Sequence, residues 1–116
     1  MAICFHDEAI AKEILMTNDV AEIKDLGRKV AGYDENIWNG LRQLIVYEGL
    51  LAKFSQNEDL KNKLKATGKA YLAECAVSDI VWGIGLSMWN PDRFDVKKWP
   101  GENRLGYALM MVREKI

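Results

Sequence analysis

The sequence predicts a mainly α (α+β) protein, a single compact helical domain with a long central helix and a short extended segment near residues 70–77. Apolar residues recur at helical spacing through the first two thirds of the chain. The length of 116 residues is enough to bury one core without metals or disulfides. Apolar residues make up 49% and charged residues 28% of the chain, which excludes a disordered or low-complexity protein.

Four helices are expected in the first two thirds of the chain. The first follows two acidic residues at positions 7–8, which suit a helix N-terminus, and it ends at residues 17–19. The second covers residues 20–30, where apolar residues are spaced three, three and four apart. The third runs from Asp34 to about Phe54, about 30 Å, and this length suggests a central helix around which the others pack. Asn57 is expected to cap a short fourth helix that ends at Thr67 and Gly68.

The last third of the chain has a different character. Residues 71–77 are too short and too tolerant of β structure to be read as a helix, and we interpret them as a strand or an extended segment. Three of the four tryptophans, both prolines and three glycines lie between Ser78 and Gly101. Asn103 is expected to cap a closing helix, with Arg113 and Lys115 near its C-terminus.

Composition excludes several classes of protein. Sixteen basic and seventeen acidic residues give a net charge of −1, so there is no basic excess with which to bind nucleic acid by bulk charge. Cys4 and Cys75 are the two cysteines and form no Cys-x-x-Cys pair, which argues against a disulfide framework or a thiolate zinc site and favours a cytoplasmic location. His6 stands alone, so no metal site is expected. Asp79 interrupts the most apolar stretch, so no membrane span is expected.

One stretch concentrates residue types that carry chemistry. Two carboxylates, Glu74 and Asp79, lie five positions apart and precede Trp82, Gly83 and Gly85. The glycines allow close backbone approach to a ligand, free N–H groups there would receive an anion, and the indole offers a face for stacking a base. The stretch is therefore a candidate active-site loop. The alternative is a plain turn in which the tryptophan lies in the core and Asp79 caps the backbone.

Several separate blocks extend this pattern in order along the chain. The most diagnostic is Trp82-Gly83-Ile84-Gly85, with Asp79 three residues upstream. The others are Leu26-Gly27-Arg28, Trp38, residues 52–57, Leu64, Thr67-Gly68, Leu72-Ala73-Glu74, Asn103-Arg104-Leu105-Gly106 and residues 109–113. Together they resemble the YbiA-like, or NADAR, family over nearly the whole chain, from about Phe5 to the C-terminus. The resemblance implies one domain over residues 1–116.

The resemblance also implies an activity. Members of the family are N-glycosidases that cleave the C–N bond between ribose and an amino-pyrimidine in early riboflavin intermediates, or remove ADP-ribose from guanine. The expected partner is therefore a small nucleotide-like substrate, a ribosylamino-pyrimidine phosphate or an ADP-ribose adduct, with no metal or other cofactor. Neither a membrane nor bulk nucleic acid is expected as a partner.

The roles of individual residues follow from the same resemblance. Asp79 would be the catalytic carboxylate. The expected substrate-binding residues are Trp38, Trp82, Gly83, Gly85, Arg28 and Asn103. Arg28 is a plausible phosphate contact, and a surface ion pair is the alternative. Asn103 matches a family position that usually follows Gly-Gln, whereas here it follows Gly-Glu, so a contact made by that glutamine amide is in doubt.

Two further expectations concern the protein as a whole. The alternative to an enzyme is a non-catalytic module, which either binds a nucleotide such as ADP-ribose or is a helical interaction module. The family's upstream strands and a Glu-containing block have no match before Met1, so we expect a domain that is N-terminally short. Either the chain is a shortened family member or the upstream part belongs to a longer gene product. Such a chain is expected to hydrolyse its substrates weakly or not at all and to self-associate through exposed apolar surface.

Overall fold

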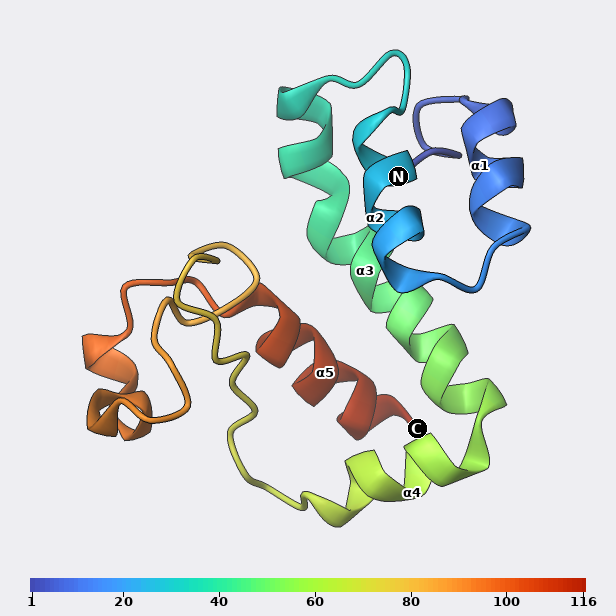
Figure 1. Ribbon diagram of the computed structural model, residues 1–116. Helices are drawn as coiled ribbons and strands as arrows, with labels where there is room; N and C mark the ends of the chain where they lie inside the picture. Colours follow the sequence, from blue (N-terminus) through green and yellow to red (C-terminus); the bar gives the residue numbers. More distant parts are fainter. The chain divides into compact units, whose positions relative to one another are not determined.

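A computed structural model describes residues 1–116 and is entirely helical in its regular structure (Figure 1). It contains five α-helices and two short 3₁₀-helices and no strand. They are α1 (Glu8–Leu15), α2 (Val20–Arg28), α3 (Glu35–Gln56), α4 (Glu58–Ala66), η1 (Pro91–Phe94), η2 (Val96–Lys98) and α5 (Arg104–Lys115). The predicted helical class and the order of the helices are confirmed. The β contribution implied by α+β is not confirmed.

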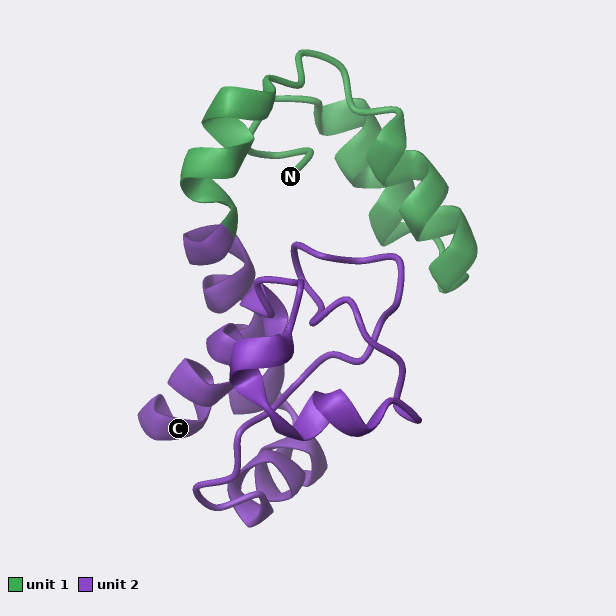
Figure 2. Cartoon of the chain, turned by 90° about the vertical axis from the view of Figure 1, so that its left-hand side faces the viewer, with its two compact units in different colours: residues 1–42 green, residues 43–116 purple.

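The chain divides into two compact units, residues Met1–Arg42 and Gln43–Ile116 (Figure 2). The division falls inside α3, so this helix belongs partly to each unit. The sequence predicts one domain over residues 1–116, and this stays a prediction. Each unit is described by itself below.

Asp7 organises the first unit. One carboxylate oxygen accepts a hydrogen bond from the N–H of Ile10 and so caps α1, while the other accepts one from the N–H of Ala31 at 2.8 Å, beyond the end of α2. These hydrogen bonds hold the pKa of Asp7 below its ordinary value of 3.8, and the bond from Ala31 has the larger effect. Helices α1 and α2 pack together, and the buried side chains are Ala2, Leu26 and Val30.

Helix α3 is the long helix that the sequence predicts. It spans 22 residues and begins after Asp34, whose Oδ1 accepts a hydrogen bond from the N–H of Ile37. It ends near Asn57, whose side chain donates to the carbonyl of Lys53 at 2.7 Å and makes no cap bond to α4. No residue of α3 is buried. The expectation that the other helices pack around it as a central helix is therefore not confirmed.

The core of the second unit lies between α4, α5 and the turn near residue 84. Its buried apolar side chains are Leu64, Ile84, Ala108 and Val112. Arg113 on α5 donates from Nη1 to the hydroxyl of Thr67 and to the carbonyl of Ala70, both at 2.8 Å. These bonds tie the end of α4 to the last turn of α5.

The strand or extended segment expected near residues 70–77 is not confirmed. Residues 70–76 lie in no helix and no strand. A strand needs a neighbouring strand with which to form repeated backbone hydrogen bonds. Here the carbonyl of Leu72 and the N–H of Glu74 bond to the side chain of Asn103, and the carbonyl of Glu74 accepts from the N–H of Ile84. These groups are thus satisfied by a side chain and a turn.

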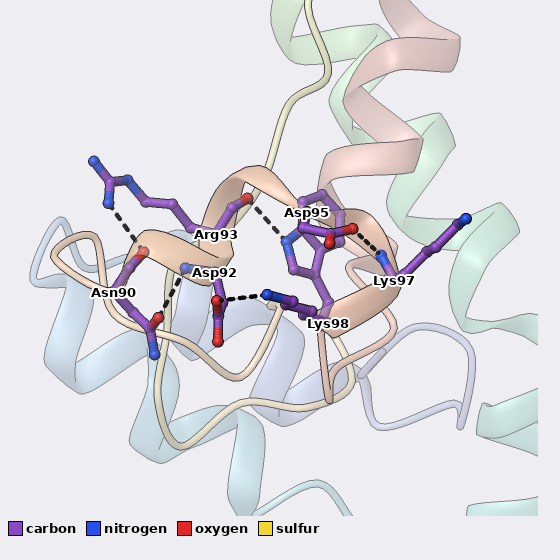
Figure 3. A network of polar contacts seen from close by, with 7 residues as sticks. Asn90, Asp92, Arg93, Asp95, Lys97 and Lys98 are labelled. Atoms are coloured by element: carbon purple, nitrogen blue, oxygen red, sulfur yellow. Dashed lines mark hydrogen bonds and ion pairs between the residues drawn. The ribbon is translucent and has the colours of Figure 1, made fainter.

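The segment that holds η1 and η2 is stabilised largely by its own residues (Figure 3). Asn90 caps η1 by accepting from the N–H of Asp92 at 2.9 Å, and Asp95 caps η2 by accepting from the N–H of Lys97 at 3.1 Å. The indole N–H of Trp99 donates to the carbonyl of Arg93 at 2.9 Å. The turn formers that distinguish this region in the sequence therefore build two short, capped helices.

None of the helices combines the length and apolar character required to cross a membrane.

Candidate active site

Asp79 begins the turn that carries the Trp-Gly-Ile-Gly block. Its Oδ1 accepts hydrogen bonds from the N–H groups of Val81 at 3.0 Å and Trp82 at 2.8 Å. The capping role that the sequence left as an alternative is therefore present. The second oxygen, Oδ2, makes no hydrogen bond, and the residue is half-buried. One oxygen fixes the backbone, and the other remains able to act on a ligand.

The start of α5 is bound to this turn by five consecutive hydrogen bonds. The backbone N–H groups of residues 101–105 donate to the carbonyls of residues 80–84, over distances of 2.8–3.1 Å. The donor and acceptor pairs are Gly101 and Ile84, Glu102 and Ile80, Asn103 and Gly83, Arg104 and Val81, and Leu105 and Trp82. We call this set the brace. The first N–H groups of a helix lack partners within it and often bind anions, but here the turn occupies them.

The N–H groups within the turn are occupied in the same way. Those of Val81 and Trp82 bond to Asp79, and that of Ile84 donates to the carbonyl of Glu74 at 2.9 Å. The sequence suggests that free N–H groups in this turn receive an anion. The N–H groups of these three residues are already satisfied within the protein.

The glycines of the turn are required for contacts within the protein. A Cβ on Gly83 would lie 2.8 Å from the carbonyl oxygen of Asp79 and 2.9 Å from that of Glu74. A Cβ on Gly101 would collide with the carbonyl oxygen of Gly83. Gly85 has a positive φ of 75°, which favours glycine. The sequence predicts that the glycines allow close backbone approach to a ligand, whereas the approach seen in the structure is between backbone segments of the chain itself.

Asn103 is fully buried and connects three segments. Its backbone has a left-handed φ of 52°, and its side chain makes no cap bond to α5, contrary to expectation. The Oδ1 atom accepts from the N–H of Glu74 at 3.0 Å, and Nδ2 donates to the carbonyl of Leu72 at 2.9 Å. Its amide thus holds residues 72–74 against the brace.

The remaining expected site residues lie in the first unit. Trp38 is half-buried on α3. Arg28 ends α2, with a side chain that is 78% exposed, and forms an ion pair with Asp25 at 3.1 Å. Arg28 also lines a cavity of about 430 Å³ with Lys24 and Tyr33. The structure therefore brings together Asp79, Trp82, Gly83, Gly85 and Asn103, while Arg28 and Trp38 belong to the other unit.

The sequence reasoning missed a cavity in the second unit and the role of Gly106. The cavity has a volume of about 380 Å³ and lies among α3, α4, residues 71–74 and α5. Lys63 and Glu74 contribute charged groups to its walls, and Phe54, Tyr71, Leu105 and Leu109 contribute apolar ones. A Cβ on Gly106 would collide with the carbonyl of Leu72 and with the amide of Asn103. The sequence feature that could have indicated the role of Gly106 is the pair of glycines, Gly101 and Gly106, on either side of Asn103.

No three or more His, Cys, Asp or Glu side chains gather closely enough to hold a metal ion. Both cysteines are free thiols.

Comparison with known proteins places these features in a family. The NADAR domain matches residues 1–116. The chain is 40% identical to N-glycosidase R617 of Acanthamoeba polyphaga mimivirus, over 98% of this chain and 67% of that protein. It is 36% identical to Protein irg-1 of Caenorhabditis elegans, over 99% of this chain and 55% of that protein. It is 30% identical to N-glycosidase YbiA of Escherichia coli strain K12, over 97% of this chain and 63% of that protein. The chain thus spans about two thirds or less of the length of these relatives.

Proposed function

Because the chain belongs to the NADAR domain family, we propose that it is an N-glycosidase, which hydrolyses the C–N bond between ribose and a heterocyclic base or amino-pyrimidine. Two of the similar proteins are named N-glycosidases. The observation that carries the proposal is the state of Asp79, whose Oδ1 is fixed by two backbone N–H groups while Oδ2 makes no hydrogen bond. A carboxylate held in this way is oriented before substrate arrives.

The proposed reaction needs only water and a positioned carboxylate. The C–N bond breaks and its electron pair moves to the nitrogen of the leaving heterocycle, so positive charge develops on the ribose ring. Water forms a new bond to C1′, and its proton passes to the leaving nitrogen. The Oδ2 atom of Asp79 would stabilise the developing cation or direct the water, and general base catalysis of this kind contributes about 10²- to 10⁴-fold.

The other proposed site residues would bind the substrate or shape the backbone around it. The indole of Trp82 follows the capped turn directly and is half-buried, so it is proposed to stack on the heterocycle. Gly83 and Gly85 fix the backbone that carries it. Trp38 and, as a phosphate contact, Arg28 remain proposed substrate-binding residues, and both belong to the first unit. The buried amide of Asn103 is fully used within the protein, so its proposed contribution is to position its neighbours.

The proposed substrates are a ribosylamino-pyrimidine phosphate or guanine-linked ADP-ribose. The reaction is proposed to need no metal or other cofactor and to take place in the cytoplasm. Two free cysteines support the reducing location.

Self-association is also proposed, because large apolar side chains such as Leu15, Trp89 and Phe94 are at least 80% exposed. Light scattering over a range of protein concentrations tests it, and a constant monomer mass would contradict it.

The proposal is tested by following product release. The chain is incubated with each proposed substrate, and free base and free sugar phosphate are separated by chromatography. An N-glycosidase releases the two in equal amounts. Glu48→Gln, which alters an exposed carboxylate on α3, is the matched control and should keep the wild-type rate. Binding of either compound without release of base would instead support the non-catalytic module.

A further inference from the structure

Both backbone polar groups of Glu74 are fixed. Its N–H donates to Oδ1 of Asn103 at 3.0 Å, and its carbonyl accepts from the N–H of Ile84 at 2.9 Å. Asn103 is itself anchored, because its N–H donates to the carbonyl of Gly83 and its Nδ2 donates to the carbonyl of Leu72. Glu74 is thus held between a buried amide and the turn that Asp79 caps.

The side chain of Glu74 contrasts with its backbone. The residue is exposed, and its carboxylate makes no hydrogen bond or ion pair. It lines the cavity of about 380 Å³, together with Lys63 and Tyr71. Cavities of this size lie at the lower end of the range that holds small molecules. An unpaired carboxylate on a fixed backbone at a cavity wall is a preorganised hydrogen-bond acceptor.

Glu74 and Asp79 are also linked through Gly83. A Cβ on this glycine would lie within 3 Å of the carbonyl oxygens of both residues, at 2.9 Å from Glu74 and 2.8 Å from Asp79. The two chain segments that bear the carboxylates therefore meet at one point. Residues 72–74 are therefore held against the turn that carries Asp79 and Trp82.

We propose that Glu74 is a substrate-recognition residue, which accepts a hydrogen bond from a hydroxyl or amino group of the substrate, and that Asn103 is a positioning residue that acts through it. This inference rests on the proposed N-glycosidase function. Asp79 acts at the bond that breaks, whereas Glu74 binds a part of the substrate that lies in the cavity. Glu74 therefore determines affinity, and its loss affects KM more than kcat.

The first test measures binding and turnover in the full chain with ADP-ribose as the binding probe. Glu74→Gln keeps the size of the side chain and removes its charge. Because hydrogen bonds to charged groups are strong, we expect the Kd of ADP-ribose and the KM of the hydrolysed substrate to rise about tenfold to a hundredfold. The kcat should change by less than about threefold. Glu48→Gln is the matched control, with both constants unchanged.

The second test is a double-mutant cycle between Glu74 and Asn103. Asn103→Ser shortens the buried amide, and Asn103→Asp replaces it if the serine variant does not fold. If Asn103 acts through Glu74, its substitution raises the Kd less in the Glu74→Gln background than in the wild-type background. A merely structural role predicts equal changes in both backgrounds, and this result would overturn the positioning role.

The outcomes separate this inference from the proposed function. A Glu74→Gln chain with wild-type Kd and KM overturns the inference while leaving turnover intact. A second outcome is that Glu74→Gln loses affinity for ADP-ribose while the wild-type chain binds ADP-ribose but releases no base. This result supports the recognition role and contradicts the N-glycosidase proposal. A wild-type chain that neither binds ADP-ribose nor releases base overturns both.

Discussion

At the scale of single residues, the two oxygens of Asp79 divide structural and chemical roles between them. The Oδ1 atom satisfies two N–H groups of the turn, as an Asx cap does. The Oδ2 atom has no partner within the protein. The capping interpretation and the catalytic interpretation are therefore compatible, because each uses a different oxygen.

The stacking role of Trp82 is tested by two substitutions. Trp82→Phe keeps an aromatic face and should weaken binding of ADP-ribose only modestly. Trp82→Ala removes the face and should weaken binding by about 1–3 kcal/mol, the usual contribution of base–aromatic stacking. The Kd is measured by calorimetry, with Trp89→Ala, an 89% exposed tryptophan, as the matched control. Equal affinity of the wild type and both Trp82 variants would show that the ring only packs.

Asp7 predicts how the first unit responds to acid. The N–H of Ala31, and then that of Ile10, lowers the pKa of this carboxyl in the folded state from 3.8. The folded form therefore binds the proton less readily than the unfolded form. The resulting stability is present above pH 3.8 and is lost as the pH falls through the lower folded-state pKa.

This prediction is measured as the melting temperature of wild type and Asp7→Asn between pH 6 and pH 2. Over the acidic part of that range, the melting temperature of the wild type should decrease more than that of the variant. Glu13→Gln, an exposed position on α1, should behave as wild type. Parallel curves for Asp7→Asn and wild type would contradict the assignment.

At the scale of elements, the brace places the active-site turn on the end of α5. Five carbonyls of residues 80–84 meet five N–H groups of residues 101–105. Because these five bonds fix its backbone, we expect the turn to be as rigid as a helix terminus, although it contains no regular structure. This rigidity is what a preorganised Asp79 requires.

Gly101 tests the importance of the brace for stability. A Cβ here would collide with the carbonyl oxygen of Gly83 and lie 2.6 Å from the carbonyl carbon of Ile84. Because both neighbours are backbone atoms, Gly101→Ala should destabilise the second unit by about 3 kcal/mol. Denaturant unfolding measures the change.

Gly49 provides the matched control for Gly101. It lies within α3, and a Cβ added to it would meet no atom within 4 Å. Gly49→Ala should therefore stabilise the chain by about 0.5–1 kcal/mol. Equal stability of the two alanine variants would show that the brace is not tightly packed.

The helices could be predicted from the sequence because their signals are local. Asp7, Asp19 and Asp34 stand directly before three of the helices and cap them. The strand or extended segment predicted near residues 70–77 is not confirmed, because the carbonyl of Leu72 and the N–H of Glu74 bond to Asn103, about thirty positions away. Asn103 and Asn57 both stand where a cap is expected, yet their amides bond elsewhere. Spacing along the chain contains no information on such distant partners.

At the scale of the whole molecule, the proposed site residues are divided between the two compact units. Asp79, Trp82, Gly83, Gly85 and Asn103 belong to residues 43–116, and Arg28 and Trp38 belong to residues 1–42. Motif order along the sequence indicated the family, which the match over residues 1–116 confirms. The order could not indicate the brace or the cavity beside Glu74, because both depend on how segments far apart in sequence pack together.

The most direct test of the account is the turnover of Asp79→Asn beside Asp79→Ala, each with its melting temperature. Asparagine retains an Oδ1 that caps Val81 and Trp82, so its fold should match wild type, while alanine loses the cap at a cost of about 1 kcal/mol. The account predicts that both variants lose kcat by about 100-fold or more. An Asp79→Asn chain that hydrolyses substrate at the wild-type rate would contradict it.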